Sequence, residues 1–417
     1  MGGGECIMAT YYVNGTSGDD SNDGTSAMAA KATVQAAIDA SSDNDTVSVA
    51  NGTYSENVTL NKDITLQSTS GTYVGTIITA SSAGKTITVT SAGDGATIKN
   101  LTIIYASTQN STTSNAGAIL SDSNGSGAIT VEGCSIVSNT CGIGYLASGT
   151  VVNRCRLTGT GVQGNATKAK GSNYGVVAYN YSITVTACLL TDWGAAGIYL
   201  DHNDSVAKSC TVVSTGNYDT YFQGAIWSTG ESSGGPTVAN CIAFNAHGTN
   251  DQGMRFGFQH SSNSHEGLFS NCLTYDSGSN RDMGDNTGTS ASSAKHEYWR
   301  MDAATTTNLY GGDYDGNGSV DNSYGDNIVN ANPIFVDHTI ANYTPHSDGS
   351  AYGNGIASLT ASLDLSGSAF NSSPSIGCFE GAASGWSGGT HVAGVAAGSC
   401  TSVVGVAVGS IASIKGV

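Results

Sequence analysis

The sequence is poor in charge, and this scarcity excludes several classes of protein. Only 11% of the 417 residues are charged, with 14 Lys plus Arg against 32 Asp plus Glu, and the formal net charge is −18. Typical globular proteins carry about 25% charged residues. A chain with so few cations has no basic stripe to neutralise phosphates, so we expect no nucleic-acid partner.

Long apolar runs and proline are also scarce. No stretch of about 18 apolar residues occurs, so we expect no transmembrane helix and no membrane insertion. The opening MGGGECIMATYYV lacks the basic and apolar regions of a signal peptide, and Met8 is a candidate start. Residues 1–8 are therefore expected to be disordered or a non-native start. With 4 Pro, 57 Gly and 39% hydrophobic residues, the composition favours many short strands joined by tight turns.

Cysteine is present in one recurring context. Six of the ten cysteines follow a short alternating run, in VEGCSIV, VNRCRLT, VTACLLT, AKSCTVV, VANCIAF and FSNCLTY (Cys134, Cys155, Cys188, Cys210, Cys241 and Cys272). An earlier copy, IKNLTII, has Leu101 in the cysteine position. Strands that recur every 21 to 33 residues leave too little chain for crossover helices. The spacing therefore predicts a parallel β-solenoid, in which equivalent side chains of successive coils stack.

The cysteine position accepts leucine, so we expect it to form an interior ladder. Strands of successive coils lie about 4.8 Å apart, and parallel Cβ vectors keep the Cβ atoms about that far apart, beyond the usual disulfide range. Buried free thiols are therefore favoured over disulfides. No CxxC pair occurs, which argues against a thiolate metal site. Free thiols fit folding in a reducing cytoplasm.

An open solenoid end exposes unpaired backbone and an apolar core, so a cap is expected. The segment TVQAAIDAS has helical spacing, and it predicts a capping helix over residues 33–41. The runs DTVSVA, ENVTL and DITLQS, which follow it, predict the first strands.

These segments carry a resemblance to a known superfamily. YYVNGTSGDDSNDGTS, TVQAAIDAS and DTVSVANGTYSENVTL resemble the opening of right-handed parallel β-helix proteins of the pectin-lyase-like superfamily. NPIFVDHTIANYTPHSDGSAYGNG and SPSIGCFEG resemble the end of the same module, so the resemblance covers residues 9–381. It implies an all-β fold, a right-handed parallel β-helix over residues 9–384 with insertions within 200–300. Because the superfamily holds lyases, hydrolases, tailspikes and non-catalytic scaffolds, it implies no single activity.

The last 33 residues, 385–417, form a second kind of repeat. Gly394, Gly405 and Gly416 are eleven residues apart, and a valine follows each of them. A repeat this regular is a structural unit used more than once. It is similar to short C-terminal repeats of bacteriophage virion proteins, which implies an attachment or oligomerisation segment that contacts other virion proteins or copies of itself. The resemblance to β-helix spikes implies a trimer as the form of self-association. The alternatives are a Gly/Ala-rich linker and a strand pair that closes the solenoid.

Candidate catalytic and glycan-binding residues gather between 199 and 285. A glycosidase needs two carboxylates across a groove, and a lyase needs a base with a partner that neutralises the uronate. The weak catalytic candidates are Asp201, Asp204, Glu266 and Asp282. The aromatic candidates for a glycan groove are Tyr199, Tyr221, Trp227, Phe256 and Phe258. No carboxylate pair stands out by spacing, and turn Asp and Asn on a polar face remain the alternative.

One local motif resembles a calcium loop. In DYDGNGSVDNSYGD, the oxygen-bearing residues at positions 1, 3, 5, 7 and 9 match that loop, and Gly318 occupies its turn position. They are Asp313, Asp315, Asn317, Ser319 and Asp321. Position 12 is Tyr324 instead of glutamate, so the motif predicts bound Ca²⁺ less firmly than a complete loop does. A metal-free polar turn is the alternative.

Together these features predict a non-enzymatic bacteriophage virion protein, such as a tail spike, tail fibre or capsid decoration protein. Assembly in the host cytoplasm would place it on the virion, where it could bind a host surface glycan. The alternative is an extracellular or virion-borne polysaccharide lyase or glycoside hydrolase acting on acidic glycans. A glycan-binding module without a catalytic pair is the third interpretation.

Overall fold

The computed structural model describes most of the N-terminal two thirds of the chain and parts of the remainder. The described residues are 8–106, 116–160, 174–213, 224–228, 236–244, 256–260, 268–275, 283–285, 328–329, 333–337, 342–381, 391–392, 395–396, 402–403 and 406–407. All structural statements below concern these residues. No helix among them is long and apolar enough to cross a membrane.

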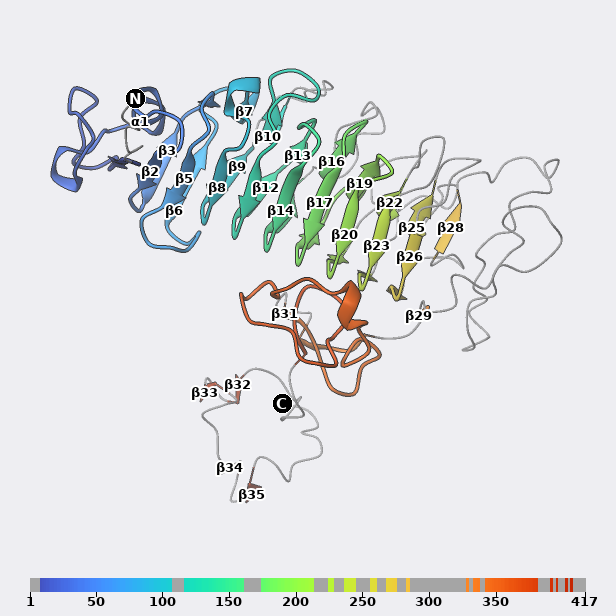
Figure 1. The fold of residues 1–417 in the computed structure, drawn as a ribbon. Coiled ribbons are helices and arrows are strands. Elements are labelled where there is room, and N and C mark those ends of the chain that lie inside the picture. The colour runs from blue at the N-terminus through green and yellow to red at the C-terminus, as the bar shows by residue number, and fades with distance from the viewer. Residues whose placement is uncertain are drawn as a thin grey trace, which may run out of the picture.

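The chain winds into a right-handed parallel β-helix, as predicted (Figure 1). From β2 to β28, each coil contributes one strand to each of three parallel sheets, in the order sheet A, sheet B, sheet C. Within this range, strands three apart in the sequence are neighbours in space, because each coil lies on the preceding one.

Sheet A contains β1 (Thr10–Val13), β2 (Thr46–Val49), β5 (Thr65–Ser68), β8 (Thr97–Lys99), β11 (Thr130–Glu132), β14 (Thr150–Asn153), β17 (Ile183–Thr186), β20 (Val206–Lys208), β23 (Thr237–Ala239) and β26 (Leu268–Ser270). Sheet B contains β3 (Gly52–Ser55), β6 (Thr76–Thr79), β9 (Thr102–Tyr105), β12 (Ser135–Ser138), β15 (Arg156–Gly159), β18 (Leu189–Thr191), β21 (Thr211–Val213), β24 (Ile242–Phe244), β27 (Leu273–Tyr275) and β29 (Ile328–Val329). Sheet C contains β4 (Val58–Leu60), β7 (Lys85–Val89), β10 (Gly117–Ser121), β13 (Cys141–Gly144), β16 (Tyr174–Tyr179), β19 (Ala196–Asp201), β22 (Gly224–Ser228), β25 (Phe256–His260) and β28 (Met283–Asp285).

A two-residue corner joins sheet A to sheet B from β8 onward. The first corner residue has a positive φ, at Asn100, Gly133, Arg154, Ala187, Ser209, Asn240 and Asn271. The second is Leu101 and then, in the six following coils, the predicted cysteine. The left-handed residue turns the chain sharply enough for the next side chain to enter the core.

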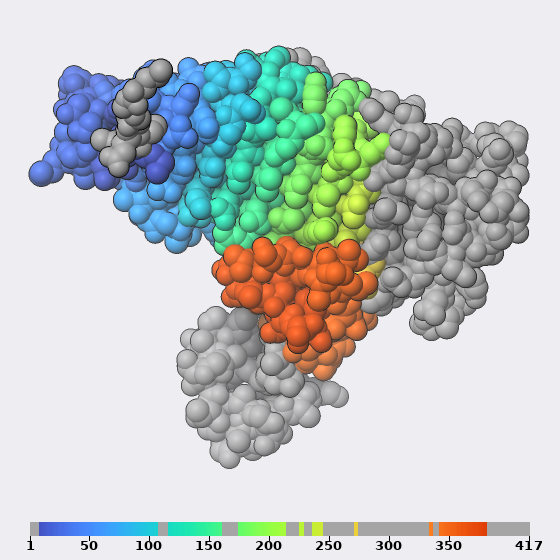
Figure 2. All heavy atoms as spheres, viewed as in Figure 1, coloured from blue at the N-terminus to red at the C-terminus, as the bar shows by residue number. Residues whose placement is uncertain are grey.

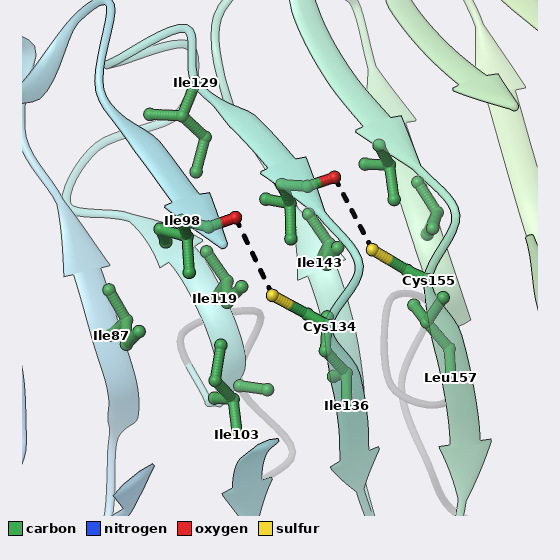
Figure 3. Close-up of a cluster of buried hydrophobic side chains, with 14 of the residues drawn as sticks. Ile87, Ile98, Ile103, Ile119, Ile129, Cys134, Ile136, Ile143, Cys155 and Leu157 are labelled. Carbon is green, nitrogen blue, oxygen red and sulfur yellow. Dashed lines mark hydrogen bonds between the residues drawn. The ribbon is translucent and has the colours of Figure 1, made fainter. Parts of the chain in front are cut away.

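The six corner cysteines form the expected interior ladder, which we call the thiol ladder. Figure 3 shows its first two members, Cys134 and Cys155. All six thiols are free and buried. Cys134 Sγ donates to the carbonyl of Ile98 at 3.7 Å, and Cys155 Sγ donates to that of Val131 at 3.5 Å. Because the acceptor belongs to the preceding coil, each thiol links two coils.

The N-terminal end is capped by α1 (Val34–Ala40), within the predicted range. Thr33 is its N-cap, and its side chain accepts from the N–H of Ala36. Glu56 accepts the N–H groups of Val34 and Gln35 at 2.9 and 3.0 Å, which satisfies two further donors at this end. Buried side chains of α1 close the end of the core. The described residues also include the short 3₁₀ helices η1 (Ala27–Ala29), η2 (Ser91–Gly93) and η5 (Ala357–Leu359).

Residues 333–337 and 342–381, named here the C-terminal clamp, do not continue the coil. They contain β30 (Phe335–Asp337) and β31 (Asn342–Pro345), an antiparallel pair, and they pack on the outer face of sheet B (Figures 1 and 2). Phe335, Ala351 and Ile376 bury Ile242 and Leu273. The C-terminal clamp thus does not add a further coil to the β-helix. It covers sheet B from outside, because the later coils carry apolar residues on both faces of this sheet.

Candidate functional site

The outer face of sheet C carries a row of three aromatic residues, which we call the aromatic row. It consists of Tyr174 in β16, Tyr199 in β19 and Trp227 in β22. Tyr199 and Trp227 are direct register partners, with ring centroids 4.5 Å apart. The rings of Tyr174 and Tyr199 stack at 5.4 Å with an interplanar angle of 30°. One ring per coil therefore continues over three successive strands.

The aromatic row belongs to a hydrophobic cluster separate from the coil core. Its other buried members are Leu120, Cys141, Val177, Ala195 and Ala196. Tyr174 and Trp227 are 6% and 7% exposed, whereas Tyr199 is half-buried. Tyr179, at the end of β16, is 45% exposed and pairs in register with Asp201. Tyr199 and Tyr179 are thus the more accessible rings, and Tyr174 and Trp227 support them.

Glycines let sheet C turn its large side chains outward. At Gly175 and Gly197 a Cβ atom would fall 2.7 Å from a Leu190 side-chain atom and 2.3 Å from one of Val212, both inside the coil. Trp193 fills the same interior, where its Nε1 donates to the carbonyl of Leu157 at 3.2 Å. The interior at this level has no room for further side chains, so the bulky residues of β16 and β19 lie outside.

Burial controls the titratable groups beside the aromatic row. It raises the pKa of the Cys141 thiol and of the Tyr145 hydroxyl far above their ordinary values. Burial also lowers the pKa of Lys85, and nearby Asp122 acts in the opposite direction. The ammonium of Lys85 donates to the Ser121 and Asp122 carbonyls. Lys85 therefore serves the local backbone and is not poised as a base toward a ligand.

The predicted carboxylates lie at one end of this face. Asp201 ends β19 and is half-buried. Asp204 follows in the turn to β20; its side chain is 85% exposed, and its N–H donates to His202 Nδ1 at 3.2 Å. This geometry is that of a local turn, so it supports the polar-turn alternative for Asp204. Glu266, Asp282 and Tyr221 lie outside the described residues.

The strand register separates the two predicted phenylalanines of β25. Phe256 is in register with Gly224 at the start of β22. Phe258 is in register with Ile226, a residue of the coil core. The proposal of Phe256 and Phe258 as groove residues stays a prediction. The register pairs Gln259 with Trp227.

Sequence reasoning missed Tyr174 and Tyr179. The signal was present, because YGVVAY and AGIYLD both precede a polar turn, and aligning their ends places Tyr179 beside Asp201. The residues of the calcium-loop motif, Asp313, Asp315, Asn317, Ser319 and Asp321, lie outside the described residues. Within the described ranges, no cluster of His, Cys, Asp or Glu has the geometry of a metal site.

Comparison with known proteins returned neither a matching family profile nor a matching curated sequence. Several solved structures are similar in backbone path. The pectate lyase Pel9A is 16% identical, with a TM-score of 0.49 over 90% of this chain and 96% of that chain. A lacto-N-biosidase from Eubacterium ramulus is 10% identical, with a TM-score of 0.43 over 66% and 57%. The pectin methylesterase PemA from Erwinia chrysanthemi is 13% identical, with a TM-score of 0.35 over 67% and 93%. On its own strand pairing, this chain is a right-handed parallel β-helix protein.

Proposed function

We propose that this chain is a structural and adhesive protein whose β-helix binds a glycan on the outer face of sheet C. The observation that carries the proposal is the aromatic row: stacked rings lie outside the coil, where closing the core does not require them. Aromatic faces are common contact surfaces for sugar rings, because an apolar body and a polar rim match a pyranose. Tyr199 and Tyr179 would make the contacts.

The C-terminal repeat supports the structural half of this proposal. Residues 385–417 contain one charged side chain, Lys415, and they repeat every eleven residues. Such a segment suits attachment to a larger assembly better than catalysis. We propose a bacteriophage particle as this assembly, because the repeat resembles those of virion proteins, and a host surface glycan as the ligand. Calcium bound at Asp313–Asp321 would belong to the same proposal.

The proposed glycan binding is tested by measuring the affinity of the chain for immobilised neutral and acidic polysaccharides. We expect the Tyr199→Ala/Tyr179→Ala double variant to lose at least about tenfold in affinity, equivalent to about 1.4 kcal/mol. Tyr12→Ala is the matched control, because Tyr12 is also a partly buried tyrosine of a strand but lies in β1 of sheet A. Equal binding by the double variant would show that the aromatic row is not the site.

The structural half is tested by deleting residues 385–417. Loss of particle association, with the β-helix still folded, is the expected result. A truncated chain that associates with the particle as the full chain does would refute the attachment role.

A polysaccharide-degrading enzyme is the second candidate, and one observation favours it. His260 and Asp285 are register partners on the neighbouring strands β25 and β28. Histidine and aspartate are the residue types of an acid–base pair, and here they occupy partnered positions of neighbouring strands. Cleavage of acidic polysaccharides, measured with and without Ca²⁺ and abolished by His260→Ala, would establish it. Glycan binding without any product release would support the adhesive function instead.

A further inference from the structure

The described strands of the C-terminal repeat form two copies of one small hairpin. In the first copy, β32 (His391–Val392) pairs antiparallel with β33 (Val395–Ala396). In the second, β34 (Ser402–Val403) pairs with β35 (Val406–Ala407) in the same register. Every paired residue of the second copy is eleven positions after its counterpart in the first. The sequence period is therefore also a period of hydrogen-bonded structure.

Neither hairpin can be stable by itself. Each is a separate two-stranded sheet, and its strands are two residues long. Two-stranded hairpins much longer than these are only marginally stable in water. Among the described residues, no strand of the repeat pairs with sheets A, B or C. Within the part of the chain that the structure describes, neither outer edge of a hairpin pairs with a strand, and such edges are templates for another strand.

The composition of the hairpins indicates which strand would add to these edges. From residue 391 to residue 407 the chain has no Asp, Glu, Lys or Arg. Charged side chains are a common means by which proteins block an exposed edge strand, and that means is absent here. Identical segments pair in register most readily, because each edge meets the same sequence and spacing. The same edges, in the same order and eleven residues apart, occur in a second copy of the chain.

We propose that the hairpins of the C-terminal repeat pair edge to edge with those of a second copy of this chain. This inference rests on the proposed attachment role and makes it specific: the first partner of the repeat is itself. Two hairpins on one chain give two contacts with a fixed separation along the sequence. Engaging the second contact after the first is then intramolecular, which strengthens the association beyond that of a single hairpin.

The hairpin geometry provides a selective test. In a hairpin with a two-residue loop, the pair beside the loop exchanges hydrogen bonds, so the N–H groups of the next pair point outward. Ala396 and Ala407 belong to this next pair. Ala396→Pro together with Ala407→Pro removes an outward N–H from each hairpin and leaves the inner pair intact. Ala396→Ser together with Ala407→Ser keeps both N–H groups and is the matched control.

Sedimentation velocity of the full-length chain over a concentration series is the measurement. We expect concentration-dependent association for the wild type and the serine control, and a loss of at least about tenfold in association constant for the proline variant. Circular dichroism should show the same β-helix in all three. A monomeric wild type, or a proline variant that associates like the control, would overturn self-pairing. A monomeric wild type that still attaches to the particle would leave the proposed attachment role standing without self-pairing.

Discussion

At the scale of single residues, the corner cysteines are small apolar core residues that also hold neighbouring coils together. Cys188 is fully buried, and its thiol donates to the carbonyl of Val152 in the preceding coil at 3.6 Å. Its sulfur also accepts the N–H of Cys155 at 3.4 Å. Burial raises the pKa of Cys188 well above its ordinary value, so the thiol stays neutral and unreactive.

Cys188→Ser should therefore destabilise the protein. The hydroxyl is more polar than the thiol and shorter in reach, so its burial costs about 1–3 kcal/mol where its hydrogen bonds are imperfect. Urea unfolding under reducing conditions measures the loss. Cys188→Ala, which creates a small cavity without burying a hydroxyl, is the control. A serine variant as stable as the wild type would mean that this position of the core tolerates a polar group.

Asp192 gives a prediction for pH dependence. Burial raises the pKa of this half-buried carboxyl, and a hydrogen bond from Thr191 acts in the opposite direction. A raised folded-state pKa adds stability below the unfolded-state pKa, and this stability is lost as pH rises through the folded-state value. Asp192→Asn should consequently stabilise the protein at neutral pH, by less than about 1 kcal/mol because solvent screens the group. The gain should vanish in acid, as thermal unfolding at several pH values would show. A gain that persists in acid would show that the ionised carboxylate is not its cause.

At the scale of elements, the side chain of Asn240, at a corner between sheets A and B, makes three hydrogen bonds to the C-terminal clamp. Asn240 has a φ of 50° and is fully buried. Its Nδ2 donates to the carbonyl of Ile356 at 2.9 Å and to Thr360 Oγ1 at 2.7 Å. Its Oδ1 accepts the N–H of Ile356 at 3.0 Å and Nδ2 of Asn271 at 2.7 Å. Both halves of the amide are used, so no aliphatic side chain can replace it.

Asn240→Ala should loosen the clamp. Removing the amide leaves partly buried backbone groups of Ile356 without these partners, which costs about 1–3 kcal/mol. Hydrogen exchange should accelerate in residues 342–381 and remain unchanged in sheets A and C near the N-terminus. Asn100→Ala is the matched control, because Asn100 has the same conformation, φ 56°, at an earlier corner. If both variants gave the same exchange pattern, backbone strain and not the amide would explain the effect.

The sequence predicted those elements whose signal is local and repeated. The cysteine spacing predicted the coils, the thiol ladder is buried as expected, and α1 lies within the range that helical spacing indicated. The C-terminal clamp was not predicted, because its contacts join residues far apart in the sequence and leave no periodic trace; the hydrogen bonds Asn240–Ile356 and Thr211–Cys378 span 116 and 167 positions. The aromatic row was named only in part: Tyr199 and Trp227 were candidates, whereas Tyr174, which stacks on Tyr199, was not.

At the scale of the whole molecule, two hydrophobic surfaces are separated by a single sheet. The coil core lies inside, and a second surface lies on the outer face of sheet B under the clamp. This outer surface includes Leu189, Val213, Ile242 and Leu273. Arg156 lies on the same face of sheet B, and its Cζ is 5.4 Å from the ring centroid of Phe379 in the C-terminal clamp. This is a cation–π contact. The clamp therefore covers apolar surface that the β-helix cannot bury for itself.

Deleting residues 333–417 should uncover this surface, whereas deleting residues 385–417 should not. An apolar patch that loses its cover binds hydrophobic dyes and promotes association. We expect the longer deletion to gain dye fluorescence and to sediment as large species, even though it lacks the repeat proposed to mediate pairing. The shorter deletion should bind no more dye than the full chain and should sediment as a monomer. A longer deletion that stays monomeric and binds no more dye than the shorter one would mean that the β-helix folds without its C-terminal clamp, and that sheet B tolerates an exposed outer face.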